Sequence, residues 1–372
     1  MPVQNFETFN TTTDKTTTTT LLHEVVPLTG TIVSGTYGGD AVSLGSEPNI
    51  KNYSHGMFQT VYDYPYLSSS ANHIFDITMG YDESSVMSAS AYTQNSKKIN
   101  MYNQFSQVLL GYAGSNNTTE IFESDLSFAD NNRQMKEVFF LNFSRLITKD
   151  QIKKGTFSIT LGTGSWANPF HATSGSVILS DVSASSTAGT NNKGNSGQYG
   201  VLYSSNGADP VLGAVGHGLV FYQAGIVVLT ASLFSTLTQS NGAGFNSGST
   251  ATVSGAAGLI LSQSMISSSI SGNCDALRHR IGNISYNNTT EINSTIYFCR
   301  VPSSKFNYSS NPTYTSGSKV RVKTIASDTP VSYITTIGLY NSSNELLAVA
   351  KLSEPIKKDP TNEVTLRVRL DY

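Results

Sequence analysis

The chain is a succession of short apolar runs separated by clusters of glycine, serine and asparagine, which is typical of strands joined by turns. Examples are "LLHEVVPLTGTIVSG", "SGSVILSDV" and "YGVLYSSN". The clearest period of two is in residues 364–370, where aliphatic side chains alternate with Thr and Arg. We therefore expect a strand there that is paired within its own sheet and has one face in a core.

Three further patterns predict individual elements. Residues 84–112 contain no Pro, and no Gly before Gly111, which predicts a helix that ends at this glycine. Its apolar side chains at helical spacing are Ile99, Tyr102, Phe105, Val108 and Leu109. "GLVFYQAGIVVLT" is apolar almost throughout and predicts a strand at the centre of the main sheet, covered on both faces. "LYNSSNELLAV" predicts a hairpin that turns at residues 341–344, and Pro355 and Pro360 predict that the following loop extends neither flanking strand.

Composition supports a folded, mainly β protein. Charged residues are only 13% of the chain, but 19 Tyr and 17 Phe are too many aromatic residues for a disordered segment. Abundant Thr, Val and Tyr favour strands over helices. We expect multi-stranded sheets or β-sandwich-like units with one or two helices and long Gly/Ser/Asn loops.

The same patterns suggest three parts. Residues 1–20 are expected to be an extended Thr-rich arm that orders only against a neighbour, because such residues bury little apolar surface. Residues 21–280 are expected to form the main β-rich domain, with the helical insertion near 84–112. Residues 281–372 are expected to form a C-terminal β-sandwich-like domain. Long loops at 183–198 and 239–258 are expected to be mobile or to contact a partner.

Charge and motifs argue against several function classes. The net charge of −2 and the absence of a long basic run argue against nucleic-acid binding. No apolar stretch is long enough to span a membrane, and the N-terminus lacks the order of a signal peptide, so we expect no membrane insertion. The usual nucleotide, metal and nucleophile motifs are missing, and the six His are scattered, so we expect no enzyme, no cofactor and no metal. Cys274 and Cys299 are expected to be reduced.

Two groups of basic residues are candidate interfaces. Arg145, Lys149, Lys153 and Lys154 give the densest positive charge in the chain. They form either a solvated turn or a docking patch for an acidic partner. Arg367 and Arg369 lie on the polar face of the predicted terminal strand, where they suit a carboxylate row on an adjacent strand or on a neighbouring subunit.

Several segments carry a resemblance to a known class of proteins. "CDALRHRIGNIS", "NSTIYFCRV", "KFNYSSNPTY" and the last forty residues resemble virion structural proteins of T4-like contractile-tailed bacteriophages, including those of marine bacteria. "VFFLNFSRLITKDQIKKGTFSITL" resembles the same proteins further upstream. The resemblance implies a structural part of the phage particle, most simply in the tail baseplate, assembled in the host bacterial cytoplasm.

The partners implied are other copies of the chain and other virion proteins. Alternatives are a receptor-binding or tail-fibre protein that recognises host surface glycan, a capsid decoration protein, and a depolymerase that acts on the glycan. The last would need two facing carboxylates, and the sequence leaves open that Asp63 or Asp76 meets a distant Glu. The absence of an internal repeat favours the baseplate over a fibre.

Overall fold

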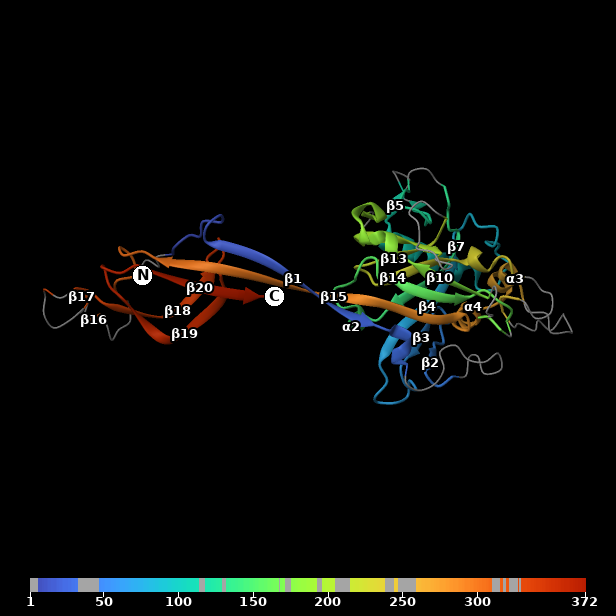
Figure 1. Cartoon of the computed structure of the whole chain (residues 1–372), viewed down its shortest axis with the longest axis horizontal. Helices are drawn as coiled ribbons and strands as arrows, with labels where there is room; N and C mark the ends of the chain where they lie inside the picture. The colour runs from blue at the N-terminus through green and yellow to red at the C-terminus, as the bar shows by residue number, and fades with distance from the viewer. Residues whose placement is uncertain are drawn as a thin grey trace. The chain divides into compact units, whose positions relative to one another are not determined.

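The computed structural model describes residues 6–32, 47–113, 118–128, 132–166, 168–170, 175–192, 196–204, 215–237, 244–246, 259–309, 315–316, 319–320, 327 and 329–372. The fold is mainly β, with 44% strand against 17% helix, which confirms the expected class. The chain divides into two compact units (Figure 1). Unit 1 comprises residues 1–21 and 291–372, and unit 2 comprises residues 22–290.

The helices are α1 (Asn95–Leu109), α2 (Arg145–Thr148), α3 (Leu261–Ser267) and α4 (Ile270–Arg278). Short 3-10 helices are η1 (Leu28–Thr31), η2 (Val182–Ser185), η3 (Thr187–Gly189) and η4 (Ala231–Phe234). The strands are β1 (Lys15–Val26), β2 (Ile50–Asn52), β3 (Gln59–Tyr62), β4 (His73–Tyr81), β5 (Tyr112–Ala113), β6 (Thr118–Thr119), β7 (Glu137–Phe143), β8 (Gln151–Ile152), β9 (Ser158–Gly162), β10 (Ser176–Ser180), β11 (Thr190–Asn192), β12 (Gln198–Ser204), β13 (Gly216–Phe221), β14 (Ile226–Thr230), β15 (Ile281–Val301), β16 (Thr315–Ser316), β17 (Lys319–Val320), β18 (Ser332–Tyr340), β19 (Leu346–Lys358) and β20 (Val364–Asp371).

Unit 2 is built on one antiparallel sheet whose centre is buried on both faces. Its strands follow the order β15-β9-β10-β12-β13-β14-β7-β4-β3-β2. In β7, Phe139 and Leu141 point into one apolar cluster and Val138 and Phe140 into a second, and all four side chains are fully buried. Because successive side chains alternate between the faces, a strand covered on both sides reads as a continuous apolar run.

The helix expected at 84–112 is confirmed over the shorter range of α1. Gln94 has a left-handed φ of 54°, so the helix begins after it, and Gly111 with φ 93° follows its last turn. Of the apolar residues at helical spacing, Tyr102 and Leu109 are fully buried, whereas Val108 is 62% exposed and does not belong to the buried face. Together α1 to α4 also exceed the one or two helices expected.

The prediction that "GLVFYQAGIVVLT" forms a single strand is wrong. It forms the hairpin of β13 and β14, which pair from Phe221–Ile226 to Gly218–Leu229. Gly225, with φ 68°, supplies the left-handed residue of the turn. The predicted central position is nevertheless found, because both strands lie inside the sheet.

Unit 1 contains the second half of β15 between β1 and β20. The terminal strand is paired as predicted: β20 is antiparallel to β15, from Val301–Val364 to Ser294–Asp371. Leu366 and Val368 are buried, and Thr365, Arg367 and Arg369 are exposed. The predicted alternation is therefore present in the folded unit.

The prediction that residues 1–20 order only against a neighbour is corrected by the structure, because part of this segment forms strand β1. Although its side chains are exposed, residues 15–20 form a strand beside β15 of the same chain instead of a free arm. Thr17 and Thr295 hydroxyls lie 3.2 Å apart, and the Thr19 hydroxyl donates to Asn293 Oδ1 at 2.7 Å. Backbone pairing and the strand preference of threonine supply the order that apolar burial cannot. The segment thus belongs to unit 1, which differs from the expected boundaries at 20 and 280.

The hairpin of β18 and β19 turns at residues 341–344, as predicted, and Asn344 has the left-handed φ of 62°. Pro355 was wrongly expected to stop the strand, since β19 continues to Lys358. The register shifts between Ile334–Ile356 and Thr336–Lys351, so Pro355 lies in the irregular stretch, where a missing N–H breaks no regular ladder bond.

The two predicted long loops, 183–198 and 239–258, differ in how much of each the structure describes. Most of 183–198 is ordered, since it holds η2, η3 and β11, and Ala184 is buried. The expected mobility is therefore wrong there, and contact with a partner stays a prediction. The loop at 239–258 lies outside the described residues except for 244–246, where Phe245 is fully buried.

Candidate functional site

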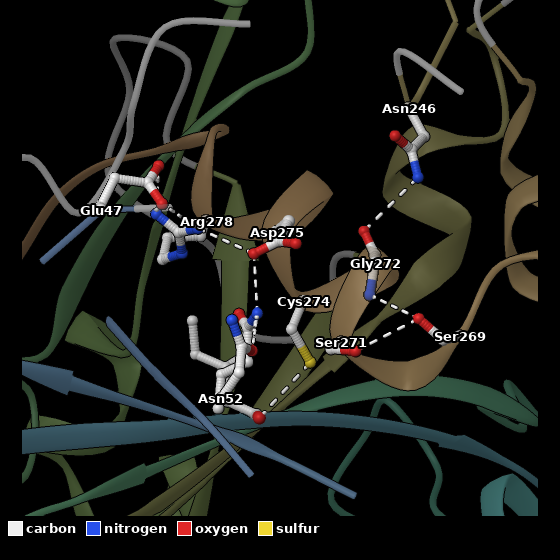
Figure 2. Close-up of polar contacts among 11 residues, drawn as sticks. Glu47, Asn52, Asn246, Ser269, Ser271, Gly272, Cys274, Asp275 and Arg278 are labelled. Carbon is white, nitrogen blue, oxygen red and sulfur yellow. Dashed lines mark hydrogen bonds and ion pairs between the residues drawn. The ribbon is translucent and has the colours of Figure 1, made fainter. Parts of the chain in front are cut away.

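A buried chain of polar side chains joins α4 to the residues around β2 and β3 (Figure 2). Arg278 Nη1 lies 3.1 Å from Glu47 Oε1, and Arg278 Nη2 lies 2.8 Å from Asp275 Oδ1. Gln59 Nε2 donates to Asp275 Oδ1 and to Asn52 Oδ1, each at 2.7 Å. The fully buried guanidinium thus lies between two carboxylates inside unit 2.

This cluster suits anchoring better than catalysis. Both charges of each ion pair are compensated inside the protein, which is the condition for tolerating a buried arginine. The neighbouring Cys274 thiol is fully buried and donates to Ile77 O at 3.4 Å. Burial raises its pKa well above the ordinary value, so the thiol stays protonated at neutral pH and is a poor nucleophile.

Local sequence explains how α4 presents these groups. Ser269 caps the helix, because its Oγ accepts a hydrogen bond from Gly272 N at 3.1 Å. Asn246 Nδ2 donates to Gly272 O at 3.4 Å and ties the first turn to a distant segment. Asp275 and Arg278 are three residues apart, which places them on one helix face. Sequence reasoning missed the cluster, and this spacing within "CDALRHR" is the local signal that points to it.

A second buried arginine is held by backbone carbonyls. Arg280 donates to Gly162 O, Gly164 O and Gly244 O, each at 2.9 Å, and to Phe245 O at 3.2 Å. Burial lowers its pKa to about 10, so it remains charged at neutral pH. It joins segments that are far apart in the chain.

Asp181 is the buried carboxyl with the most distinctive environment. Its oxygens accept hydrogen bonds from Gly155 N at 2.9 Å, Phe157 N at 2.8 Å and the Tyr222 hydroxyl at 2.9 Å. Burial raises its pKa to about 6, against the opposing effect of these donors. The side chain is fully enclosed, so its role is to fasten the turn after β8 to β10 and β13.

No group of three or more His, Cys, Asp or Glu side chains that could hold a metal ion occurs in the described part of the chain. None of the helices that the structure describes is long and apolar enough to cross a membrane. Cys274 and Cys299 are both free thiols.

The structure separates the six predicted interface residues into two groups. Arg145, Lys149, Lys153 and Lys154 lie in and around α2 and β8 of unit 2. Arg145 is exposed and donates to Gln223 O at 2.7 Å, while Lys154 Nζ donates to the Gln198 side-chain oxygen. The basic side chains are thus partly engaged within unit 2, and a docking role for them stays a prediction.

Arg367 and Arg369 lie on the exposed face of β20 in unit 1. The expected carboxylate row on the adjacent strand is wrong for Arg369. Its Nε lies 2.8 Å from Asp371 Oδ1 of the same strand and donates to Ser294 Oγ at 2.8 Å. Opposite Arg367 in register is Phe298 of β15. A role for this pair against a neighbouring subunit stays a prediction.

Sequence reasoning missed how much apolar surface unit 1 exposes. Its described hydrophobic residues that count as buried are Val301, Leu339, Leu366 and Val368, at 7–9% exposure. By contrast, Leu346, Leu347 and Val349 in β19 are 51%, 69% and 54% exposed. A sheet with so much apolar side chain in solvent is a candidate for contact with another chain.

Comparisons with protein-family models, with curated proteins and with solved structures find no match.

Proposed function

We propose that the protein is a structural subunit of a tailed-phage particle, most simply a tail baseplate component, which assembles through protein–protein interfaces. The observation that carries the proposal is the exposed apolar surface of unit 1, together with its small buried core. Such a surface gains stability when another chain covers it.

Other features support an architectural role. The buried ionic groups of unit 2 are compensated and link distant segments, and this arrangement rigidifies a scaffold. The surface is nearly neutral and carries few charges, which allows large contact areas without strong repulsion between copies. The sequence resemblance to virion structural proteins supplies the kind of assembly.

The test is the presence and location of the chain in purified particles. We expect peptides of this chain in gradient-purified virions, and gold-labelled antibodies against it at the baseplate end of the tail. Particles stripped of tails serve as the control and should lose the label. Label on the head would favour the capsid decoration alternative, and label on extended fibres would favour the receptor-binding alternative. Absence of the chain from purified particles would contradict the proposal.

A further inference from the structure

One end of the sheet in unit 2 carries a line of polar side chains on its outward face. Lys51 of β2, Thr60 of β3, Asp76 of β4 and Asn142 of β7 lie opposite one another in register across four neighbouring strands. Residues directly opposite in antiparallel strands share a face, so these four side chains form one line, which we call the polar row. The other face of the same strands packs into the core, where Phe75 is fully buried.

Asp76 holds the polar row together and keeps room for a ligand. The Thr60 hydroxyl donates to Asp76 Oδ1 at 2.7 Å, and Asn142 Nδ2 donates to Asp76 Oδ2 at 3.3 Å. His73 Nε2 lies 3.0 Å from Asp76 Oδ1, and the aspartate side chain is 22% exposed. An ionised carboxylate offers about four acceptor sites, so Oδ2 retains capacity for a further donor. Among the described residues, neither Asn142 Oδ1 nor Lys51 Nζ has a hydrogen-bond partner.

Aromatic rings adjoin the polar row. The Tyr53 hydroxyl lies 3.2 Å from the Thr60 hydroxyl, and the Tyr53 ring is stacked on His55 with centroids 5.1 Å apart. Tyr62 follows Thr60 by two residues on β3, which places both on one face, and its ring packs against Tyr66 at 6.4 Å. His55 is exposed and Tyr66 is 37% exposed, so ring surface faces solvent beside the hydrogen-bonding groups.

The combination of groups indicates which class of ligand fits. A pyranose sugar carries hydroxyl groups around its rim and C–H groups on its two faces. Hydroxyls exchange hydrogen bonds with carboxylate, amide and ammonium groups, and C–H groups pack against the electron-rich face of an aromatic ring. A carboxylate at the centre repels phosphates and acidic sugars. Charged side chains are also depleted from the centre of protein interfaces, which favours a sugar over a protein partner here.

We propose that the polar row and its adjoining rings bind a neutral oligosaccharide. Asp76 Oδ2 and Asn142 Oδ1 accept hydrogen bonds from sugar hydroxyls, while the Tyr66 ring packs against a C–H face. Lys51 Nζ donates to a further sugar oxygen. This inference goes beyond the proposed function and does not depend on it, since a subunit at any place in the particle can carry such a surface.

Affinity electrophoresis of the full chain tests the proposal. Native gels are cast with one of three neutral polysaccharides, dextran, mannan or galactan, and a fourth gel contains the acidic polysaccharide alginate. We expect at least one neutral polysaccharide to retard the wild-type protein and alginate to leave its mobility unchanged. The dependence of mobility on polysaccharide concentration gives the dissociation constant.

Three variants locate the binding on the sheet face. Asp76→Asn removes a charged acceptor and should raise the dissociation constant about tenfold. Tyr66→Ala removes an exposed ring and should raise it about fivefold. The matched control is Tyr333→Ala, which truncates a tyrosine of unit 1 that is 63% exposed and should leave binding unchanged. Thermal midpoints of all variants identify any that fail to fold, and if Asp76→Asn does, Tyr66→Ala decides.

The outcomes that would overturn the inference are specific. They are wild-type mobility that none of the three neutral polysaccharides changes, and retardation that persists undiminished in the folded variants. Retardation by alginate alone would also overturn it, because an anionic chain would then be bound by basic residues elsewhere on the protein.

Discussion

At the scale of single residues, Asp181 links stability to pH. Its folded-state pKa of about 6 lies above that of an unfolded aspartate, so its stabilising effect is complete below about pH 4 and is lost as the pH rises through 6. We expect the free energy of unfolding of the wild type, relative to Asp181→Asn, to fall by roughly 2 kcal/mol between pH 4 and pH 7. Urea titrations of both proteins at several pH values measure this difference.

Tyr222→Phe is the matched control for that prediction. It removes a hydrogen bond that lowers the pKa of Asp181, but it keeps the carboxyl group. The pH dependence should therefore persist in this variant and move to higher pH. A constant difference between wild type and Asp181→Asn across the whole range would show that Asp181 is ionised throughout.

At the scale of elements, Lys98 attaches α1 to the end of α3. The fully buried ammonium donates to Met265 O at 2.6 Å and to Ser268 O at 2.9 Å. Lys98→Met leaves these carbonyls without their donor, and we expect a loss of about 2 to 4 kcal/mol in the free energy of unfolding. The adjacent exposed Lys97, which donates to His55 O, offers the control, since Lys97→Met should cost less than about 1 kcal/mol in the same denaturant titration. Equal losses would refute the anchoring role.

The elements also show which features of the fold can be predicted from local sequence patterns. The alternation in β20 and the Asn-rich turn of β18–β19 are local signals, and both predictions are confirmed. Residues 218–230 form two strands instead of one because Gly225 between them is left-handed, and α1 begins where it does because Gln94 is left-handed. Hydrophobic periodicity predicts neither of these backbone conformations. The order of β1 comes from a strand nearly three hundred residues away, so its own composition could not reveal it.

The candidate sites were less predictable than the elements. Arg278, Arg280 and Lys98 are fully buried although these residue types are usually exposed, because carboxylates or carbonyls from distant segments satisfy them. Only the Asp275–Arg278 spacing is visible locally. The basic residues at 145–154 were located by charge density, but their contacts with Gln223 and Gln198 depend on the fold.

At the scale of the whole molecule, the two units differ in how much apolar side chain they bury. The described core of unit 1 consists of side chains that retain 7–9% exposure, whereas much of unit 2 is built on fully buried strands. Burial of apolar area is the main favourable term in folding, so unit 1 should be the less stable of the two. The division of the chain makes this measurable, because the single tryptophan, Trp166, lies in unit 2.

We therefore expect urea unfolding at low protein concentration to show two steps in far-ultraviolet circular dichroism. Tryptophan fluorescence should follow only the second, because Trp166 is buried against His279 within unit 2. Leu366→Ala should weaken the first step by about 2 to 3 kcal/mol and leave the fluorescence midpoint unchanged, since it truncates a buried side chain of β20. Leu370→Ala on the same strand, where the side chain is only half-buried, should have a smaller effect. A single transition that both probes report at one midpoint would mean that the units unfold together, and the small core of unit 1 would then have to draw its stability from unit 2.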